Sequence, residues 1–285
     1  MLAYHIPNWR YLTVVSALPP FLVLVFFPFI QESPRWLLTQ RKTKDALAVL
    51  TTVANWNSRA PPTIETMEAL QTSVLRESSD VLKGFDGIKQ IIRNRRLRID
   101  LIILTWATVA CSVVYCGVSF SAKSLSGSPY WNMLYMGILD FLGVPAVLIF
   151  NRLGRKKSYL IYMGLASAFL ISILVMEAVI GNAEDYPFLI TVFALLGRFG
   201  IVAASGALIC IVMETFPTTL RSTCYGFTAF AGYMGGVVAP QAVFLGSISR
   251  SIPYILYCTL TVTSFASSLF LQDMAGVPLK DTANI

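Results

Sequence analysis

The sequence has 285 residues, of which 55% are hydrophobic and only 13% are charged, and its net charge is +7. A soluble domain carries about 25% charged residues, so the composition excludes an ordinary soluble domain. The single histidine, His5, and the scattered serines form no constellation of catalytic residues, and we therefore expect no enzyme. The cysteines lack the spacing of metal ligands, so we expect neither a metal nor a cofactor.

Long apolar segments occur along the whole chain. A bilayer core of about 30 Å needs roughly 20 apolar residues in a helix. Seven segments qualify as spans: 11–30, 99–120, 131–150, 159–180, 188–213, 223–245 and 253–271. The pattern predicts an all-α, multi-pass protein whose surroundings are a lipid bilayer. It divides into an extracellular start with one transmembrane helix (1–30), a cytoplasmic loop (31–98), a six-helix transmembrane bundle (99–271) and a cytoplasmic tail (272–285).

Lysine and arginine are distributed unevenly between the connecting segments. Segments 31–98, 151–158, 214–222 and 272–285 contain 18 of the 22 basic residues. By the positive-inside rule these segments are cytoplasmic, which places the amino terminus outside and the carboxyl terminus in the cytoplasm. The basic excess therefore indicates membrane topology and contact with anionic lipid headgroups, and it argues against a nucleic-acid partner.

The long polar segment 31–98 shows helical periodicity in three pieces. The first covers 42–54, the second follows Pro61 and Pro62, and the third is the basic stretch IKQIIRNRRLR, which leads into the second span. We expect amphipathic helices lying on the cytoplasmic face. The high serine and threonine content leaves a disordered linker open as the alternative.

Asp140 and Arg198 lie well inside predicted spans, where an ionised side chain is expensive, so each is a candidate functional site. Glu177 lies close to the outer end of the fourth span, from which it can reach the lipid headgroups. Asp140, at the centre of the third span, has no ionised partner within one helical turn. It either contacts substrate, a proton or a gate, or makes a structural hydrogen bond. Arg198 in the fifth span either lines a cavity or extends its guanidinium toward the membrane surface.

Several motifs resemble the organic cation/anion transporter family of the major facilitator superfamily. Residues 32–38 read ESPRWLL after an apolar span, and residues 151–157 read NRLGRKK, similar to the loop motif D-R-x-G-R-R/K of the superfamily. Residues 196–199 read LGRF, and residues 214–221 read ETFPTTLR, similar to E-x-[YF]-P-T-x-x-R. Trp106, Tyr115 and Gly117 match the aromatic pattern of the family's seventh helix.

The resemblance implies a helical bundle of the major facilitator type, of which the chain covers helices six to twelve. Five preceding helices, and with them the amino-terminal half of the substrate cavity, would be missing. Alternating access to a central site would carry a small organic ion through the plasma membrane. The implied gating residues lie in the two cytoplasmic motifs: Arg152, Arg155, Glu214 and Arg221. Arg155 and Glu214 would form a latch across the cytoplasmic mouth, whereas Asn151 replaces the usual aspartate of the loop motif.

The position that separates cation from anion carriers in this family holds neither expected residue. Where cation carriers have aspartate and anion carriers have arginine, this chain has Tyr233. Asp140 supplies a carboxylate, and Trp106, Tyr115 and Tyr233 offer aromatic faces for a cation. We therefore expect these residues and Arg198 to contact substrate, with an organic cation or a zwitterion favoured.

Two other hypotheses about the function remain. Seven spans with an external amino terminus also describe a seven-helix receptor, although the 68-residue cytoplasmic segment after the first span argues against one. A chain that lacks half of a carrier could alternatively be a non-transporting regulatory fragment that associates with a full-length relative.

Overall fold

The computed structural model describes residues 2–27, 30–79, 91, 93–123, 125–149, 154–180, 186–216, 218–246, 249 and 251–271. Over these residues the chain is helical and contains no strand, which confirms the predicted all-α class. The chain divides into two compact units, Met1–Lys83 and Gly84–Ile285.

The described part of the first unit contains five helices: α1 (Leu2–His5), α2 (Trp9–Phe26), α3 (Pro34–Thr39), α4 (Thr43–Trp56) and α5 (Ile64–Ser79). The side chain of Asn8 caps α2 by accepting a hydrogen bond from the Arg10 amide. Helices α3, α4 and α5 pack around a small core of their own, made by Leu37, Leu38, Ala46 and Met67. The helices expected at 42–54 and after Pro62 are therefore present as α4 and α5. Their placement on a membrane surface stays a prediction.

The second unit is a bundle of six long helices: α7 (Arg95–Phe120), α8 (Pro129–Ile149), α9 (Arg155–Ile180), α10 (Pro187–Thr215), α11 (Thr218–Leu245) and α12 (Ser251–Ser268). A short 3-10 turn, η2 (Ser121–Lys123), extends α7. Of the described helices, five are long and apolar enough to cross a membrane, namely α2 and, in the bundle, α7 with η2, α9, α10 and α11. Helices α8 and α12 complete the bundle, and all seven predicted spans fall on helices.

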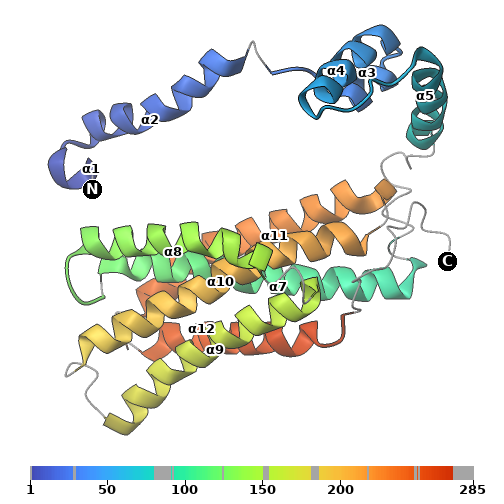
Figure 1. The fold of residues 1–285 in the computed structure, drawn as a ribbon. Helices are drawn as coiled ribbons and strands as arrows, with labels where there is room; N and C mark the ends of the chain where they lie inside the picture. The colour runs from blue at the N-terminus through green and yellow to red at the C-terminus, as the bar shows by residue number, and fades with distance from the viewer. Residues whose placement is uncertain are drawn as a thin grey trace. The chain divides into compact units, whose positions relative to one another are not determined.

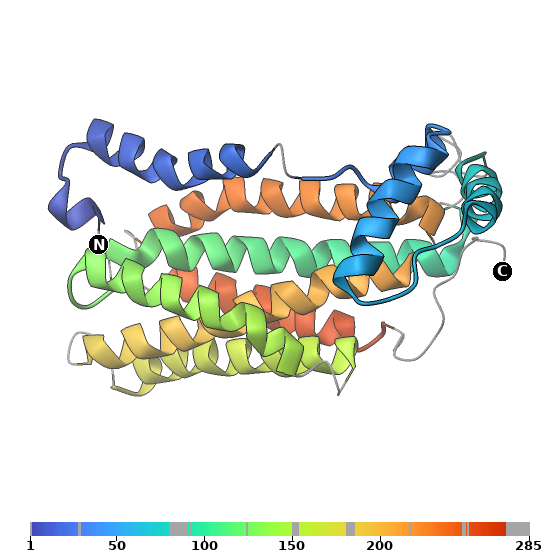
Figure 2. The ribbon, with the colours of Figure 1, turned by 45° about the horizontal axis from the view of Figure 1, so that its top comes forward.

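Glycine residues set the closest approaches between the helices of the bundle. Helix α11 lies along α7, and α9 lies along α10 (Figures 1 and 2). A methyl group added to Gly232 of α11 would come within 2.8 Å of Thr108 Cγ2 on α7. A methyl group on Gly200 of α10 would come within 2.9 Å of the Tyr162 carbonyl oxygen on α9. Small residues at these positions let the backbones pack closely, as is usual between membrane helices.

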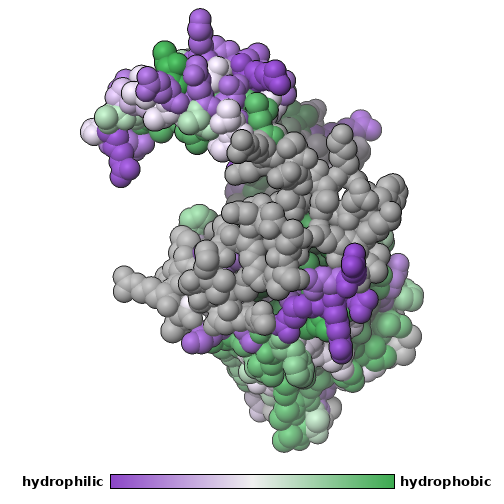
Figure 3. Space-filling model, turned by 90° about the vertical axis from the view of Figure 1, so that its right-hand side faces the viewer, coloured by the Kyte–Doolittle hydropathy of each residue, from purple (hydrophilic) through white to green (hydrophobic). Residues whose placement is uncertain are grey.

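The two ends of the bundle differ in character. Helices α7, α9 and α11 begin at one end, and α10 and α12 finish there. The first turns of the three starting helices contain Arg95, Arg155 and Arg221, so we call this the basic end. Figure 3 views the molecule from this side and shows hydrophilic residues at the end of the bundle and hydrophobic residues over its flank. At the other end, which we call the far end, α7 and α11 finish and α10 and α12 begin.

The helix at the second predicted span starts earlier than its hydropathy indicates. Asn94 caps α7, since its Oδ1 accepts hydrogen bonds from the amides of Arg96 (3.0 Å) and Leu97 (3.4 Å). The first turn of α7 therefore contains basic residues that, from the sequence, we expect in the loop before the span. Hydropathy marks where a helix becomes apolar, whereas the cap marks where the backbone becomes helical.

Candidate functional site

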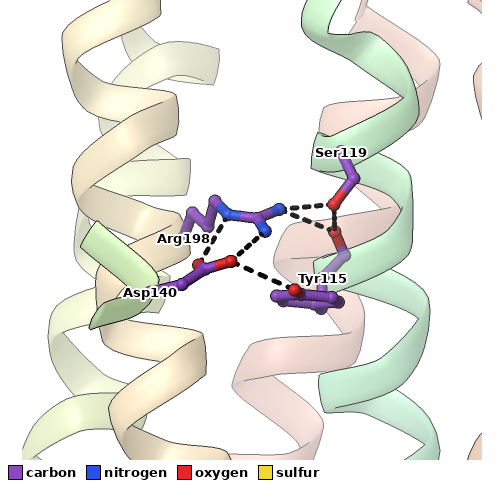
Figure 4. A network of polar contacts seen from close by, with 4 residues as sticks. All are labelled: Tyr115, Ser119, Asp140 and Arg198. Atoms are coloured by element: carbon purple, nitrogen blue, oxygen red, sulfur yellow. Dashed lines mark hydrogen bonds and ion pairs between the residues drawn. The ribbon is translucent and has the colours of Figure 1, made fainter. Parts of the chain in front are cut away.

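Asp140 and Arg198 form an ion pair inside the bundle (Figure 4). Arg198 Nε donates to Asp140 Oδ1 over 3.0 Å, and Arg198 Nη2 donates to Asp140 Oδ2 over 2.7 Å. The planar guanidinium thus holds the carboxylate with two parallel hydrogen bonds, the strongest arrangement for this pair. Arg198 is buried, with 4% of its side chain exposed, whereas 29% of Asp140 is exposed.

Close packing between α8, α9 and α10 brings these two side chains together. Gly197 and Gly200 of α10 lie against α9. Arg198 follows Gly197 and is rotated by about 100° around the helix axis, so it points away from that contact. Gly143, one turn after Asp140, packs against Val202 of α10, since a methyl group there would lie 2.7 Å from Val202 Cγ1. The glycines therefore fix the distance from α8 to α10 at which the ion pair closes.

Helix α7 supplies the remaining partners of the pair. The Tyr115 hydroxyl donates to Asp140 Oδ2 over 3.1 Å, and Arg198 Nη1 donates to the Tyr115 carbonyl oxygen over 3.2 Å and to Ser119 Oγ. The guanidinium carbon of Arg198 also lies 4.1 Å from the centre of the Tyr115 ring. All three guanidinium nitrogens are thus engaged, and three helices meet at one charge-balanced network.

A pocket of about 190 Å³ lies between α7, α10 and α11, on the side of the network toward the basic end. Ser112 of α7, one turn before Tyr115, lines it, as does Ser205 of α10, two turns after Arg198. Tyr225 and Tyr233 line it from α11. The described lining residues offer hydroxyl groups, aromatic rings and a thiol, but no carboxylate, ammonium or guanidinium group. We call it the uncharged pocket.

The structure brings together three of the five residues that we predicted to contact substrate. Tyr115, Asp140 and Arg198 form the network, and Tyr233, 76% exposed, lies in the uncharged pocket. Trp106 lies elsewhere, because its indole Nε1 donates to Thr263 Oγ1 of α12 over 3.3 Å. Nor is the ring of Tyr115 open on both faces to a substrate cation, since the guanidinium of Arg198 lies over it. Ser119 was not predicted, and no local pattern distinguishes it.

The four predicted gating residues are not all together. Arg155 Nε donates to Glu214 Oε1 over 3.1 Å, so α9 and α10 are joined at the basic end as the latch hypothesis requires. Arg221 takes no part in that pair, and its Nε and Nη2 are buried without a hydrogen-bond partner among the described residues. Arg152 lies outside the described residues. Glu214 follows Arg198 by 16 residues on α10, so the latch and the network are about 24 Å apart along the helix.

Comparison with known proteins identifies the family. A family model described as "Sugar (and other) transporter" matches residues 3–285. The chain belongs to this transporter family. It is 31% identical over 99% of its length to solute carrier family 22 member 1 of Sus scrofa. It is 30% identical over 99% of its length to organic cation/carnitine transporter 2 of Homo sapiens. Each alignment covers 49% of the relative, so the chain spans about half the length of the curated relatives it matches.

These matches confirm the predicted resemblance to the organic cation/anion transporters of the major facilitator superfamily. The chain accordingly belongs to a family of membrane transporters, and the relatives it matches are transporters and not enzymes. The seven-helix receptor reading is wrong, because both the family model and the relatives are transporters.

Proposed function

We propose that the chain carries small organic zwitterions across a membrane by alternating access, as the part of a solute carrier that contains the Asp140–Arg198 pair. Membership of a transporter family supports transport of an organic substrate. The observation that carries the choice of substrate is the two-fold hydrogen-bonded pair of Asp140 with Arg198.

The charge of this pair supports a zwitterion over a cation as the substrate. Because Arg198 already neutralises Asp140, a lone organic cation would have to compete with a buried guanidinium for the same carboxylate. Breaking a buried pair by removing one partner costs about 3–5 kcal/mol. A zwitterion brings both charges, so its cationic group can take Asp140 while its anionic group takes Arg198. One ion pair is then exchanged for two. The name of one relative, organic cation/carnitine transporter 2, includes such a compound, since carnitine is a zwitterion.

The uncharged pocket suits the rest of such a substrate. It begins about one helical turn from Tyr115 along α7 and offers hydroxyl groups and the rings of Tyr225 and Tyr233. An uncharged lining of this kind accommodates an alkyl or aromatic body and does not compete for the charged groups. In this arrangement Tyr233 contacts the body of the substrate and does not select its charge.

Gating would take place at the basic end. We propose that the Arg155–Glu214 contact closes this end while the site is open to the other side, with Arg152 and Arg221 assisting. Rocking of one helical bundle against another around a fixed site is the usual mechanism of such carriers. The distribution of basic residues supports an amino terminus outside and a carboxyl terminus in the cytoplasm. The plasma-membrane location is proposed from the family resemblance.

Uptake of three molecules of similar shape tests the substrate. Choline is a cation, glycine betaine a zwitterion and isovalerate an anion. In proteoliposomes containing the purified chain, we expect betaine uptake to exceed that of choline and isovalerate. Asp140→Asn and Arg198→Gln should each abolish it, whereas Trp106→Phe, away from the network, should not. Choline uptake that exceeds betaine uptake and survives Arg198→Gln would overturn the zwitterion proposal.

A second candidate rests on the length of the match. Because the chain spans about half of each relative, it could act by associating with a full-length relative and not by transporting alone. Co-expression with such a relative separates the two. Reduced uptake by the relative, together with co-purification and no uptake by the chain alone, would favour the regulatory role.

A further inference from the structure

A second cavity in the bundle lies away from the network and from the uncharged pocket. It has a volume of about 350 Å³ and is at the far end, where η2, the start of α10, the end of α11 and the start of α12 meet. It shares no lining residue with the uncharged pocket or with the four residues of Figure 4. We call it the far-end cavity.

We propose that the far-end cavity is a second ligand site, which binds an uncharged small molecule with an apolar body and one or two hydroxyl or carbonyl groups. This inference does not depend on the proposed substrate. It rests on the volume of the cavity, on the chemistry of its walls and on the rigidity of the segments that form them.

Four of the ten described lining residues carry hydroxyl groups, and the other six are apolar. Ser121, Ser126, Thr191 and Tyr254 contribute the hydroxyl groups. Leucine, isoleucine, valine and proline side chains make the rest of the lining, and none of the ten described lining residues is ionised at neutral pH. An ion would lose its hydration there without gaining a counter-charge from these residues, whereas an uncharged molecule would not. A few convergent polar groups in an otherwise apolar cavity of this size are typical of small-molecule sites.

The walls are held in place without a ligand. Asn132 of α8 is 2% exposed, and its side-chain amide donates to the carbonyl oxygens of Ala122 (3.2 Å) and Ser126 (3.1 Å). The Ser126 amide in turn donates to Thr191 Oγ1 of α10 over 2.9 Å. The segment from η2 to α8 is thereby tied to the start of α10. A site whose walls are already positioned loses little conformational entropy when it binds.

One buried hydroxyl group lies beside the cavity. Tyr257 of α12 is 1% exposed, and its hydroxyl lies against the side chain of Ser121, which lines the cavity. Its ring lies directly against Gly117 of α7, whose carbonyl oxygen accepts a hydrogen bond from the Ser121 hydroxyl over 2.9 Å. Tyr257 also packs edge-on against Tyr254, which lines the cavity. Tyr257 therefore connects the cavity wall to the packed interior of the bundle, which adds to the rigidity of the site.

The last turn of α7 connects this cavity to the ion-pair network. Ser119 accepts a hydrogen bond from Arg198, and Ser121, two residues later, lines the far-end cavity. Helix α10 makes the same connection, because Thr191 lines the cavity and Arg198 lies about 11 Å further along the helix. A molecule in the far-end cavity would therefore contact two of the three helices that hold Asp140 and Arg198. Binding there is expected to influence the network.

Three matched probes test the proposal: p-phenylbenzyl alcohol, p-phenylbenzylammonium and p-phenylbenzoate. Titration calorimetry on the purified chain in lipid nanodiscs should show saturable binding of the alcohol, with the two charged probes weaker by about tenfold or more. Val243→Trp fills the cavity and should abolish binding. Val238→Trp, on the same helix at a position 55% exposed and outside the cavity lining, is the matched control and should bind as the parent does.

Further variants separate this site from the others. Asp140→Asn should keep binding of the alcohol even if it loses all uptake, so failure of the zwitterion proposal leaves this one standing. Binding that survives Val243→Trp in a variant shown to be folded by circular dichroism would mean partition into lipid and would overturn the site. Tighter binding of p-phenylbenzoate that depends on Arg250, a residue outside the described ones, would overturn the uncharged ligand class.

Discussion

Arg155 on α9 and Glu214 on α10 meet at the basic end, with 3.1 Å between Nε and Oε1 and 29% of each side chain exposed. Each residue lies in one of the two motifs that resemble the superfamily's cytoplasmic sequences. The pair joins the first turn of α9 to the last turn of α10, which also carries Arg198. A change at this contact therefore acts on the helix that positions the ion-pair network.

Charge reversal tests whether the contact is a latch. Because a partly exposed pair contributes only about 0.2–1 kcal/mol, Arg155→Glu or Glu214→Arg alone should change uptake by about two- to fivefold and leave the fold intact. The double variant restores the attraction with the charges exchanged. We expect its betaine uptake in proteoliposomes to return to within about twofold of the parent. A double variant no better than either single one would show that the contact has no role in gating.

Removing one member of the Asp140–Arg198 pair should reduce stability more than removing both. Asp140→Asn leaves the guanidinium of Arg198 buried without its counter-charge, and we expect the free energy of unfolding to fall by about 2–4 kcal/mol. Adding Arg198→Gln to this variant removes the unpaired charge and should recover part of that loss. Thermal unfolding of both variants in nanodiscs measures the difference. Equal midpoints would mean that Arg198 finds another partner or water when Asp140 is neutralised.

The sequence predicts individual residues of this site better than it predicts contacts between residues that are far apart in the chain. Asp140 and Arg198 stand out because charged residues are rare in apolar spans. Their pairing does not, since the two residues are 58 positions apart and meet only when Gly143 and Gly200 set the spacing of α8, α9 and α10. Sequence alone thus left both residues with open roles, and only the packing of three helices shows that each is the partner of the other.

The sequence predicts the fold more completely than it predicts the Asp140–Arg198 network. Apolar segments of membrane length predicted every helix of the bundle, because in a bilayer an apolar stretch has few alternatives to a helix. The ends of the helices are harder to predict from the sequence, because the cap at Asn94 and not the hydropathy sets where α7 begins. The sequence does not predict the far-end cavity, since Ser126, Asn132 and Thr191 are ordinary polar residues near the ends of predicted spans. Their hydrogen bonds depend on how the α7–α8 connection meets α10.

Gly200 offers a test of helix packing. A methyl group there would lie 2.9 Å from both Ala166 Cβ and the Tyr162 carbonyl oxygen, so α9 and α10 would have to separate. Gly200→Ala should therefore lower the free energy of unfolding by about 1–3 kcal/mol. Gly226→Ala on α11, where nothing lies within 4 Å, is the matched control and should be neutral or stabilising by up to about 1 kcal/mol. Equal unfolding midpoints for the two variants would contradict the close approach of α9 to α10.

Two neighbouring lysines at the start of α9 separate a structural role from a general effect of charge. Lys156 Nζ donates to the carbonyl oxygens of Leu269 (2.8 Å) and Leu271, and Arg96 Nη2 donates to that of Phe270 over 3.3 Å. The carbonyl groups after α12 are thus held by cations from α9 and α7, where the helix dipole favours positive charge. Lys157 is exposed, and its side chain makes no hydrogen bond or ion pair among the described residues.

Lys156→Met should therefore loosen the end of α12, whereas Lys157→Met removes the same charge and should not. We expect amide hydrogen exchange over residues 265–271 to accelerate by about fivefold or more in Lys156→Met, equivalent to about 1 kcal/mol of local stability. Exchange in Lys157→Met should match the parent. If both variants accelerate exchange equally, the effect comes from net positive charge at the basic end, and the two hydrogen bonds of Lys156 contribute nothing of their own.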